Sequence, residues 1–280
     1  MDAPQTDVLS IEEIPVNEQD EMGSIAFVTI RRPDKLNALN ADVMSSLKDM
    51  VAWVEATESI RVVVLTGAQP NEPLEGKRAK PNAFVAGADI TEFVGKRSDE
   101  IRVTFAKNAV EALWGLSKPT IAMVDGFALG GGCEVACSCD LRIASSRSKF
   151  GTPEINLGLI PGYGATQRLS QLIGYGKTME MIMTGEMVDA AEAHRIGLVN
   201  HVCSSDELSE FTLNMARLIG SKSSHTLRIG KQTIRASLDL GMTEGIAYEA
   251  EEFASLFDSK DKEIGVHAFL NRETPRWEHK

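Results

Sequence analysis

The sequence predicts an α/β fold that ends in a helical region. Strand-like apolar segments followed by helical ones recur as far as about residue 150. Beyond Ile160 the apolar spacing becomes helical, and only Leu198–Val202 interrupts it as a strand. With 280 residues, of which 43% are hydrophobic and 25% charged, the chain has the composition of a globular protein.

Shifts in composition divide the chain into three regions. Residues 1–23 are polar and are predicted to form a loose lead-in. Residues 24–203 are predicted to form the α/β core, and residues 204–280 a C-terminal helical region.

The first half of the core alternates strands and helices. Ser24–Arg31 is rich in apolar and β-branched residues, as strands are. Ala41–Thr57 has apolar residues at helical spacing, and Arg61–Thr66 is almost continuously apolar, which is typical of a strand covered on both faces. Gly67–Ala83 is rich in proline and asparagine and is predicted to be an exposed loop; its cations are Lys77, Arg78 and Lys80.

Short strands and glycine turns follow. We expect a strand at Phe84–Ala86, one helix over Thr91–Leu116 and a strand at Pro119–Asp125. The run Gly130–Gly132 opens a short helix over Cys133–Ser138. Further strands are expected at Asp140–Ala144 and Lys149–Phe150, and further helices at Gly164–Ile173, Lys177–Met183, Ala190–Ile196, Asp206–Ile219, Ser224–Leu240, Thr243–Asp258 and Lys260–Asn271.

Acidic residues outnumber basic ones, 40 to 29, so the net charge is −11 at pH 7. This charge disfavours binding to nucleic acid or to an anionic membrane, and neither is an expected partner. The first 23 residues carry seven acidic side chains, no basic one and no apolar block, which argues against a secretory signal or a transit peptide. No run reaches the roughly 18 apolar residues of a membrane span.

The four cysteines are interpreted as small core residues. Cys133, Cys137 and Cys139 are clustered and Cys203 stands apart, a spacing that fits neither a disulfide framework nor a zinc site. The five histidines lie far from one another, so no metal site is expected. We therefore predict a reduced, cytoplasmic protein.

A triple glycine before a helix is the most informative motif. Gly130–Gly132 lets backbone N–H groups approach a ligand closely, and the helix that follows favours negative charge at its first turn. An oxyanion formed from a carbonyl would suit this place. Glu134 falls in the first or second turn, where an acidic residue also stabilises a helix for purely structural reasons.

A second acidic residue lies in an apolar setting. Glu154 follows Phe150–Pro153 and precedes the mostly apolar segment Ile155–Ile160. We expect burial to disfavour its charged form and to raise its pKa, as a general acid near neutral pH requires. Glu134 and Glu154 together suggest an acid/base pair, although the sequence alone does not place them in space.

A second segment of small residues is Ala86–Ile90. It follows a predicted strand and leaves the backbone accessible for hydrogen bonding. The structural alternative is a tight strand-to-helix turn in which Asp89 is the N-cap.

These motifs keep the order and spacing of a known family over roughly residues 24–270. The matching segments are Arg32–Leu39, Ala86–Ile90, Lys118–Gly126, Ala128–Glu134, Phe150–Glu154, Ile160–Leu169, Thr184–Glu186 and Ala193–Val199. The chain resembles the crotonase superfamily, and most closely its enoyl-CoA hydratases. The resemblance implies a spiral of strand–strand–helix repeats with a C-terminal helical region.

The resemblance also implies the catalytic residues. The backbone N–H groups of Ala88 and Gly131 would form an oxyanion hole for a thioester carbonyl. Glu134 would activate the water that attacks C3, and Glu154 would deliver a proton to C2. The backbone of Gly162 would support this site.

For the CoA part of the substrate, the resemblance implies Ala86, Asp89 and Ile90, chiefly through their main chain, and Lys35 near the phosphates. CoA belongs to the substrate, and no metal or redox cofactor is implied. The implied reaction is the reversible hydration of a 2-trans-enoyl-CoA to a 3-hydroxyacyl-CoA.

Three alternatives stay open. A double-bond isomerase would use a single acid/base group, and other relatives act on other acyl-CoA substrates. An RNA-binding homologue would need a basic helical strip, but Lys48 is the one cation of Ala41–Thr57.

Members of the superfamily form trimers or hexamers, so the resemblance implies such an assembly for this chain. Residues 204–280 would form much of the interface, and Lys260 and Lys262 are candidate cations for the CoA site of a neighbouring subunit.

Two features depart from the pattern of the family. Thr152 stands where hydratases often have glutamine, so the surroundings of the two glutamates would differ. The Gly67–Ala83 loop is longer than usual, and we hypothesise that Lys77, Arg78 or Lys80 reaches the CoA phosphates. A solvated loop is the alternative.

Overall fold

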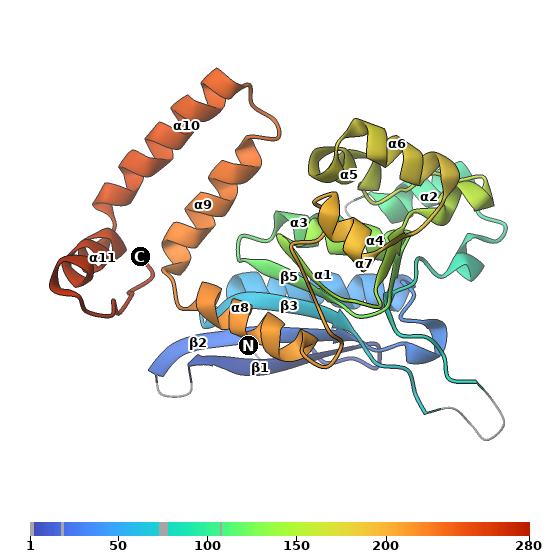
Figure 1. Cartoon of the computed structure of the whole chain (residues 1–280), viewed down its shortest axis with the longest axis horizontal. Helices are drawn as coiled ribbons and strands as arrows, with labels where there is room; N and C mark the ends of the chain where they lie inside the picture. Colours follow the sequence, from blue (N-terminus) through green and yellow to red (C-terminus); the bar gives the residue numbers. More distant parts are fainter. Residues whose placement is uncertain (1–2, 18–19, 73–77, 107) are drawn as a thin grey trace.

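The computed structural model describes residues 3–17, 20–72, 78–106 and 108–280 (Figure 1). Within these residues the chain forms one six-stranded and one four-stranded sheet, with helices packed against them. Helices α8 to α11 follow the last strand. The predicted α/β architecture with a helical C-terminal region is therefore confirmed.

The larger sheet has the strand order β1-β2-β3-β5-β7-β10. Its neighbouring strands are parallel except for β1 and β2, which pair antiparallel. The strands are β1 (Leu9–Asn17), β2 (Asp20–Ile30), β3 (Ile60–Gly67), β5 (Thr120–Val124), β7 (Leu141–Ser145) and β10 (His201–Cys203).

The prediction of a loose lead-in over residues 1–23 is wrong. β1 occupies Leu9–Asn17 and pairs with β2 from Leu9 opposite Ile30 onward. Leu9 and Ile11 are buried in the main core, whereas Val16 is buried in the cluster on the other face of the sheet. The adjacent Glu12 and Glu13 interrupt the apolar alternation, which made this strand hard to recognise from the sequence.

The smaller sheet has the order β4-β6-β8-β9, and β4, β6 and β8 are parallel. Each of these three strands leads directly into a part of the predicted site: Ala86–Ile90, Gly130–Gly132 and Thr152–Glu154. Because the carboxyl ends of parallel strands meet at one edge of a sheet, the three segments come together. The strands are β4 (Ala83–Val85), β6 (Phe127–Leu129), β8 (Lys149–Gly151) and β9 (Val188–Asp189).

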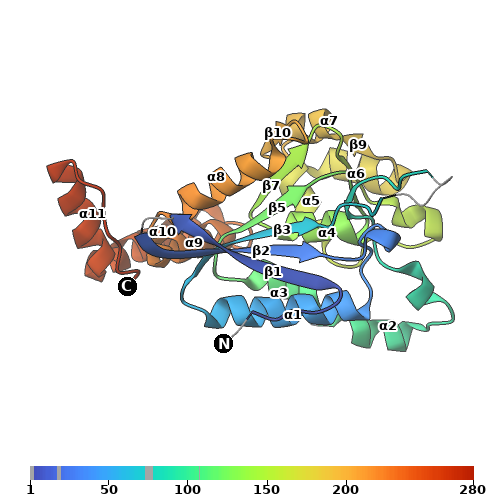
Figure 2. The ribbon, with the colours of Figure 1, turned by 90° about the horizontal axis from the view of Figure 1, so that it is seen from below.

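Helices cover both faces of the larger sheet. Figure 2 shows α1 and α3 on one face and α8 on the other. α1 and α3 pack over the main cluster of buried apolar side chains, and α8 packs over a second cluster. No helix among the described residues is both long and apolar enough to cross a lipid bilayer. The helices are α1 (Ala41–Ala56), α2 (Ser98–Phe105), α3 (Ala109–Gly115), α4 (Gly131–Ser138), α5 (Ala165–Ile173), α6 (Tyr175–Thr184), α7 (Ala190–Arg195), α8 (Leu208–Gly220), α9 (Ser224–Ala236), α10 (Met242–Ser255) and α11 (Lys260–Asn271), with 3-10 turns η1 (Pro33–Lys35), η2 (Ile90–Phe93), η3 (Pro153–Leu157) and η4 (Leu256–Asp258).

The single helix predicted over Thr91–Leu116 is wrong, because η2, α2 and α3 stand in its place. Asn108 starts α3: its side-chain oxygen accepts hydrogen bonds from the N–H groups of Val110 (2.9 Å) and Glu111 (3.0 Å). An asparagine that satisfies first-turn donors in this way begins a new helix. α2 ends before this cap, at Phe105.

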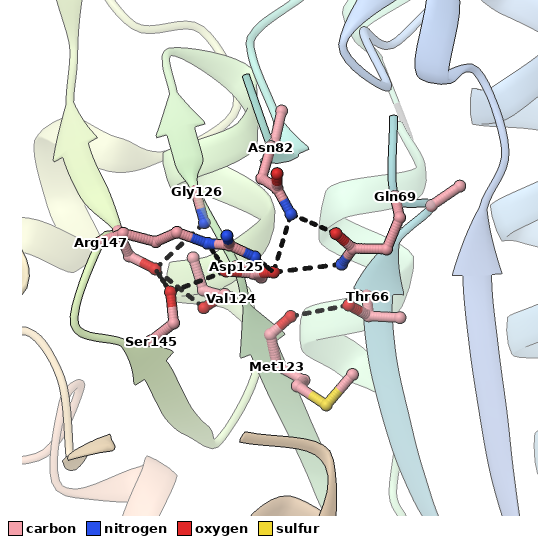
Figure 3. A network of polar contacts seen from close by, with 12 residues as sticks. Thr66, Gln69, Asn82, Met123, Val124, Asp125, Gly126, Ser145 and Arg147 are labelled. Atoms are coloured by element: carbon pink, nitrogen blue, oxygen red, sulfur yellow. Dashed lines mark hydrogen bonds and ion pairs between the residues drawn. The ribbon is translucent and has the colours of Figure 1, made fainter. Parts of the chain in front are cut away.

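A polar network joins the ends of neighbouring strands (Figure 3). The carboxylate of Asp125, directly after β5, accepts hydrogen bonds from Arg147 (2.7 and 2.5 Å), Ser145 (2.8 Å), Asn82 (2.9 Å) and Gln69 (3.1 Å). Burial by itself would raise the pKa of Asp125, but the bonds from Arg147, Ser145 and Gln69 together hold it below its usual value. Since Asn82 immediately precedes β4, the network ties the start of this strand to the larger sheet.

Figures 1 and 2 show α9, α10 and α11 extending away from the two sheets; we call residues 224–280 the arm. The end of the chain folds back onto it. The N–H groups of Glu278 (2.7 Å) and His279 (3.0 Å) donate to the buried carboxylate of Asp261, and the indole N–H of Trp277 donates to the carbonyl of Ser221 (2.9 Å).

Candidate active site

A cavity of about 530 Å³ lies where α2, α4, η3 and the segment after β4 meet. Its lining contains both predicted carboxylates, Glu134 and Glu154, and both predicted backbone donors, Ala88 and Gly131. Ala86, Ile90 and Gly162 line it as well. The fold therefore brings most of the predicted site residues to one place.

The triple glycine allows three segments to approach one another. Gly130 has φ +51°, and a Cβ at this position would lie 2.9 Å from Glu154 Oε1. A Cβ on Gly132 would lie 1.9 Å from the carbonyl oxygen of Val85, a contact that no side chain can make. Glycine is thus required here by the positive φ and by the packing of α4 against β4.

Two backbone N–H groups face the cavity from different elements. Leu39 N–H donates to the carbonyl of Gly87 (2.9 Å), and Asp89 N–H donates to the carbonyl of Leu39 (2.7 Å). Because successive N–H groups alternate along an extended chain, the N–H of Ala88 is directed away from Leu39. Gly131 is the first residue of α4, where N–H groups have no partner within the helix, and its Cβ would lie 3.6 Å from the nitrogen of Ala88.

Glu134 is almost fully enclosed, with 1% of its surface exposed. Its Oε1 accepts hydrogen bonds from the N–H groups of Tyr163 (2.6 Å) and Ala165 (3.0 Å). Burial raises the pKa of Glu134 to about 7; these two bonds oppose the rise, and the neighbouring Glu154 adds to it. The group is therefore able to exchange a proton near neutral pH.

Glu154 lies in η3 and its pKa is raised, as the sequence predicted, because burial disfavours the charged form. Its Oε2 is buried and has no hydrogen-bond partner within the described residues. The same holds for the hydroxyl of Thr152, which is fully buried and is not part of the cavity lining. Within the described residues, the Thr152 hydroxyl thus makes no hydrogen bond to either glutamate.

Asp89 and Lys35 do not line the cavity. The carboxylate of Asp89 pairs with Arg32 (3.0 Å) and accepts a hydrogen bond from the hydroxyl of Thr91 (2.7 Å), so the N-cap alternative describes its side chain. Lys35 is exposed in η1. Their roles in CoA binding stay predictions.

The cations of the Gly67–Ala83 loop differ in their surroundings. Lys77 lies outside the described residues. Arg78 and Lys80 are exposed, and Lys80 Nζ donates to the carbonyl of Asp34 (2.5 Å), next to Lys35. In the arm, Lys260 pairs with Glu278 (2.9 Å) and Lys262 with Glu263.

Several cavity residues were not predicted from the sequence. The cations Lys96 and Arg102 line the cavity, as do the aromatic side chains of Phe105 and Tyr163. Ile101 and Phe105 are four residues apart and share one helix face, a spacing that the sequence does contain. The spacing does not indicate that this helix face meets η3 and the segment that follows β4.

Comparison with known proteins identifies the family. Residues 20–280 match the family described as enoyl-CoA hydratase/isomerase. A probable enoyl-CoA hydratase of Rhizobium meliloti is 39% identical over 272 residues, 97% of this chain and 100% of that protein. The short-chain-enoyl-CoA hydratase of Clostridium acetobutylicum is 40% identical over 252 residues, 89% and 92% of the two chains.

The crystal structure of an enoyl-CoA hydratase subunit from Geobacillus kaustophilus superposes with a TM-score of 0.83 at 36% identity, covering 98% of this chain and 100% of that one. Because the match covers nearly the whole chain, the predicted crotonase-type fold is confirmed as well. The chain therefore belongs to the enoyl-CoA hydratase/isomerase family of enzymes.

Proposed function

We propose that this protein catalyses the reversible addition of water to a 2-trans-enoyl-CoA, which gives a 3-hydroxyacyl-CoA. One observation carries the proposal: Glu134 and Glu154, two carboxyl groups with raised pKa values, line the same cavity as the backbone donors of Ala88 and Gly131. The names of the relatives support the same reaction.

The backbone donors would stabilise the charge that forms during the reaction. When water adds to C3 of a conjugated thioester, negative charge moves onto the thioester oxygen. The N–H groups of Ala88 and Gly131 would hydrogen-bond this oxygen, and the loss of one such donor typically lowers a rate by about 10²–10³.

The two glutamates would move the protons. Glu134, ionised and held by the N–H groups of Tyr163 and Ala165, would take a proton from water as its oxygen bonds to C3. Glu154, whose protonated form is favoured by burial, would give its proton to C2. The product then carries a hydroxyl group on C3 and a new hydrogen on C2, and the same steps in reverse remove water.

The CoA part would lie along Ala86 and Ile90 at the edge of the cavity. Because the chain carries a net charge of −11, a polyanionic ligand needs local positive charge. Lys96 and Arg102 line the cavity, and Lys35 and Arg78 are exposed cations that would add to the attraction. The proposed mechanism uses these side chains and backbone groups, without a metal or redox cofactor.

The test is the loss of the conjugated thioester absorbance when crotonyl-CoA is added to the purified protein. We expect Glu134→Gln and Glu154→Gln each to lower kcat by about 10²-fold or more, since each removes a proton-transfer group. The exposed Glu210→Gln on α8 is the matched control and should retain full activity. Absorbance that persists with enoyl-CoAs of several chain lengths would contradict the proposal.

A double-bond isomerase is the second candidate, because the family includes isomerases and Glu154 has a carboxyl oxygen without a protein partner in the described residues. An isomerase needs a single acid/base group. If this were the reaction, Glu134→Gln would leave the conversion of a 3-enoyl-CoA to a 2-enoyl-CoA largely intact. The hydratase proposal requires that Glu134→Gln slow hydration by about 10²-fold or more.

A further inference from the structure

Two aromatic rings stack at one side of the catalytic cavity. Phe105, the last residue of α2, and Tyr163, in the turn before α5, lie with their ring centroids 4.4 Å apart and their planes 2° from parallel. Both line the cavity that contains Glu134 and Glu154. Stacked rings of this kind form a continuous apolar surface and stabilise each other modestly.

The ring pair lies directly against the catalytic groups. A Cβ on Gly162 would be 2.5 Å from Phe105 Cε1, so the phenyl ring contacts the backbone there. A Cβ on Gly131 would be 3.6 Å from Tyr163 Cδ2, which places the tyrosine ring beside the backbone donor. The N–H of Tyr163 also holds Glu134.

The tyrosine is fixed from behind. Arg168 Nη1 donates to the carbonyl of Tyr163 (2.7 Å), and Arg168 Nη2 pairs with Glu111 (2.6 Å). Tyr163 is 7% exposed and Arg168 is 9% exposed. Arg168 therefore fixes the backbone segment that carries the tyrosine ring.

A second cavity, of about 900 Å³, lies behind Arg168, between α9 and the body of the protein. Trp114, Leu172 and Ile234 contribute apolar surface to it. Glu111 and Arg168 line this second cavity but not the catalytic one, whereas Phe105 and Tyr163 line the catalytic one alone. The ion pair and the ring pair thus stand between the two spaces.

We propose that the Phe105–Tyr163 pair bounds the acyl pocket and restricts the enzyme to short, straight 2-enoyl chains. The proposal rests on the hydratase function proposed above, since it assumes that C2 and C3 lie between Glu134 and Glu154. Each methylene buried on binding ordinarily strengthens binding about fourfold. Chains longer than the pocket gain nothing further and must displace the rings.

The test measures kcat/KM for 2-trans-enoyl-CoAs of four, six, eight, ten and twelve carbons. In the unaltered enzyme, kcat/KM should fall at least tenfold from six to ten carbons. Phe105→Ala, which removes one ring, should raise the ratio of the ten-carbon to the four-carbon value at least tenfold. Tyr163→Phe keeps the stack and should retain the original ratio, and Phe211→Ala on α8, away from the cavity, is the matched control.

Equal kcat/KM values across the series in the unaltered enzyme would overturn the proposal. So would a folded Phe105→Ala variant whose ratio stays within twofold of the original. If Phe105→Ala does not fold, Phe105→Leu replaces it, with a smaller increase in the same ratio expected and an unchanged ratio counting against the proposal.

Affinities for saturated acyl-CoAs separate this inference from the proposed reaction. Butyryl-CoA should bind at least as tightly as decanoyl-CoA to the unaltered protein, and decanoyl-CoA should bind more tightly to Phe105→Ala. If this pattern appears without hydration at any length, the hydratase proposal fails and the pocket length stands. If decanoyl-CoA binds the unaltered protein more tightly, the length inference fails whatever the reaction.

Discussion

At the scale of single residues, the site depends on keeping carboxyl groups out of water without pairing them to cations. Glu134 is 1% exposed and receives two backbone N–H groups instead of a lysine or arginine. Such dipoles hold an anion but do not fully replace its hydration, so the pKa of Glu134 rises to about 7. An ordinary surface glutamate would be ionised but far too weak a base at this pH.

This pKa sets the expected pH dependence of hydration. Glu134 must be ionised to accept a proton, so kcat/KM for crotonyl-CoA should rise with pH through about 7, falling about tenfold for each pH unit below it. Glu154 must be protonated to donate, so the rate should fall as the pH rises through its own raised pKa. Steady-state rates between about pH 5 and pH 9 measure this profile, and a rate that does not change across the acid limb would contradict the role of Glu134.

At the scale of elements, the active site is built where the carboxyl ends of β4, β6 and β8 meet. The strand order within the sheet decides which segments form the site, because the loops that follow neighbouring parallel strands lie at the same edge of the sheet. The Asp125 network adds a connection between sheets, since it joins the residue before β4 to the ends of β5 and β7.

Removing the carboxylate of Asp125 should destabilise this connection. Asp125→Ala leaves Arg147, Ser145 and Asn82 without their common acceptor, and we expect the free energy of unfolding to fall by about 2–3 kcal/mol. The lower end applies if solvent screens Arg147, whose side chain is 50% exposed. Denaturant unfolding measures the loss, and Asp125→Asn, which keeps an acceptor oxygen, should lose less.

The contribution of the Asp125 carboxylate to the free energy of unfolding should decrease at acidic pH. The pKa of Asp125 lies below its usual value in the folded protein, so the stabilisation is complete above the ordinary carboxyl range and is lost as the pH falls through the lowered pKa. If Asp125→Ala and the unaltered protein have equal stability at neutral pH, the network does not hold the sheets together.

At the scale of the whole molecule, the arm exposes more apolar surface than a monomer can leave in water without cost. Phe253, Phe257, Phe269 and Leu270 are 64%, 55%, 83% and 74% exposed. They lie on α10, η4 and α11, away from both cores. We propose that further copies of this chain cover these side chains in a homotrimer or a hexamer.

Light scattering coupled to size-exclusion chromatography tests the assembly. The unaltered protein should have three or six times the 30.4 kDa mass of the chain. Phe269→Asp combined with Leu270→Asp should shift it toward the monomer by placing charges in the buried contact. Lys48→Asp, on the outer face of α1, is a control that should not change the mass. A monomer at micromolar concentration would contradict the proposal.

Much of the site was accessible from the sequence because its chemistry depends on residue types in short segments. A triple glycine before a helix predicts a close backbone approach and a place suited to an oxyanion. The apolar context of Glu154 predicted its raised pKa, which the structure confirms. The apolar stripe of α1 was equally readable, and Val43, Leu47 and Val54 are buried in the core.

Other features depended on which segments meet. β1 was missed because Glu12 and Glu13 interrupt its alternation, and only its pairing with β2 places Leu9 and Ile11 in the main core. The break before Asn108 was missed because the apolar pattern continues across it. The stacking of Phe105 on Tyr163 joins two segments that are distant in sequence and individually unremarkable.

Local composition and spacing in the sequence thus determined the α/β class and the glycine turn. The ordered motifs indicated the family by resemblance, and that resemblance implied the roles of the two glutamates. Only the tertiary structure decided that Asp89 faces Arg32 and not the cavity, that Phe105 and Tyr163 close one side of it, and that the arm presents its apolar side chains to solvent. The physical reason is that burial, desolvation and ring packing are properties of contacts between distant segments, and these contacts exist only once the strands are paired.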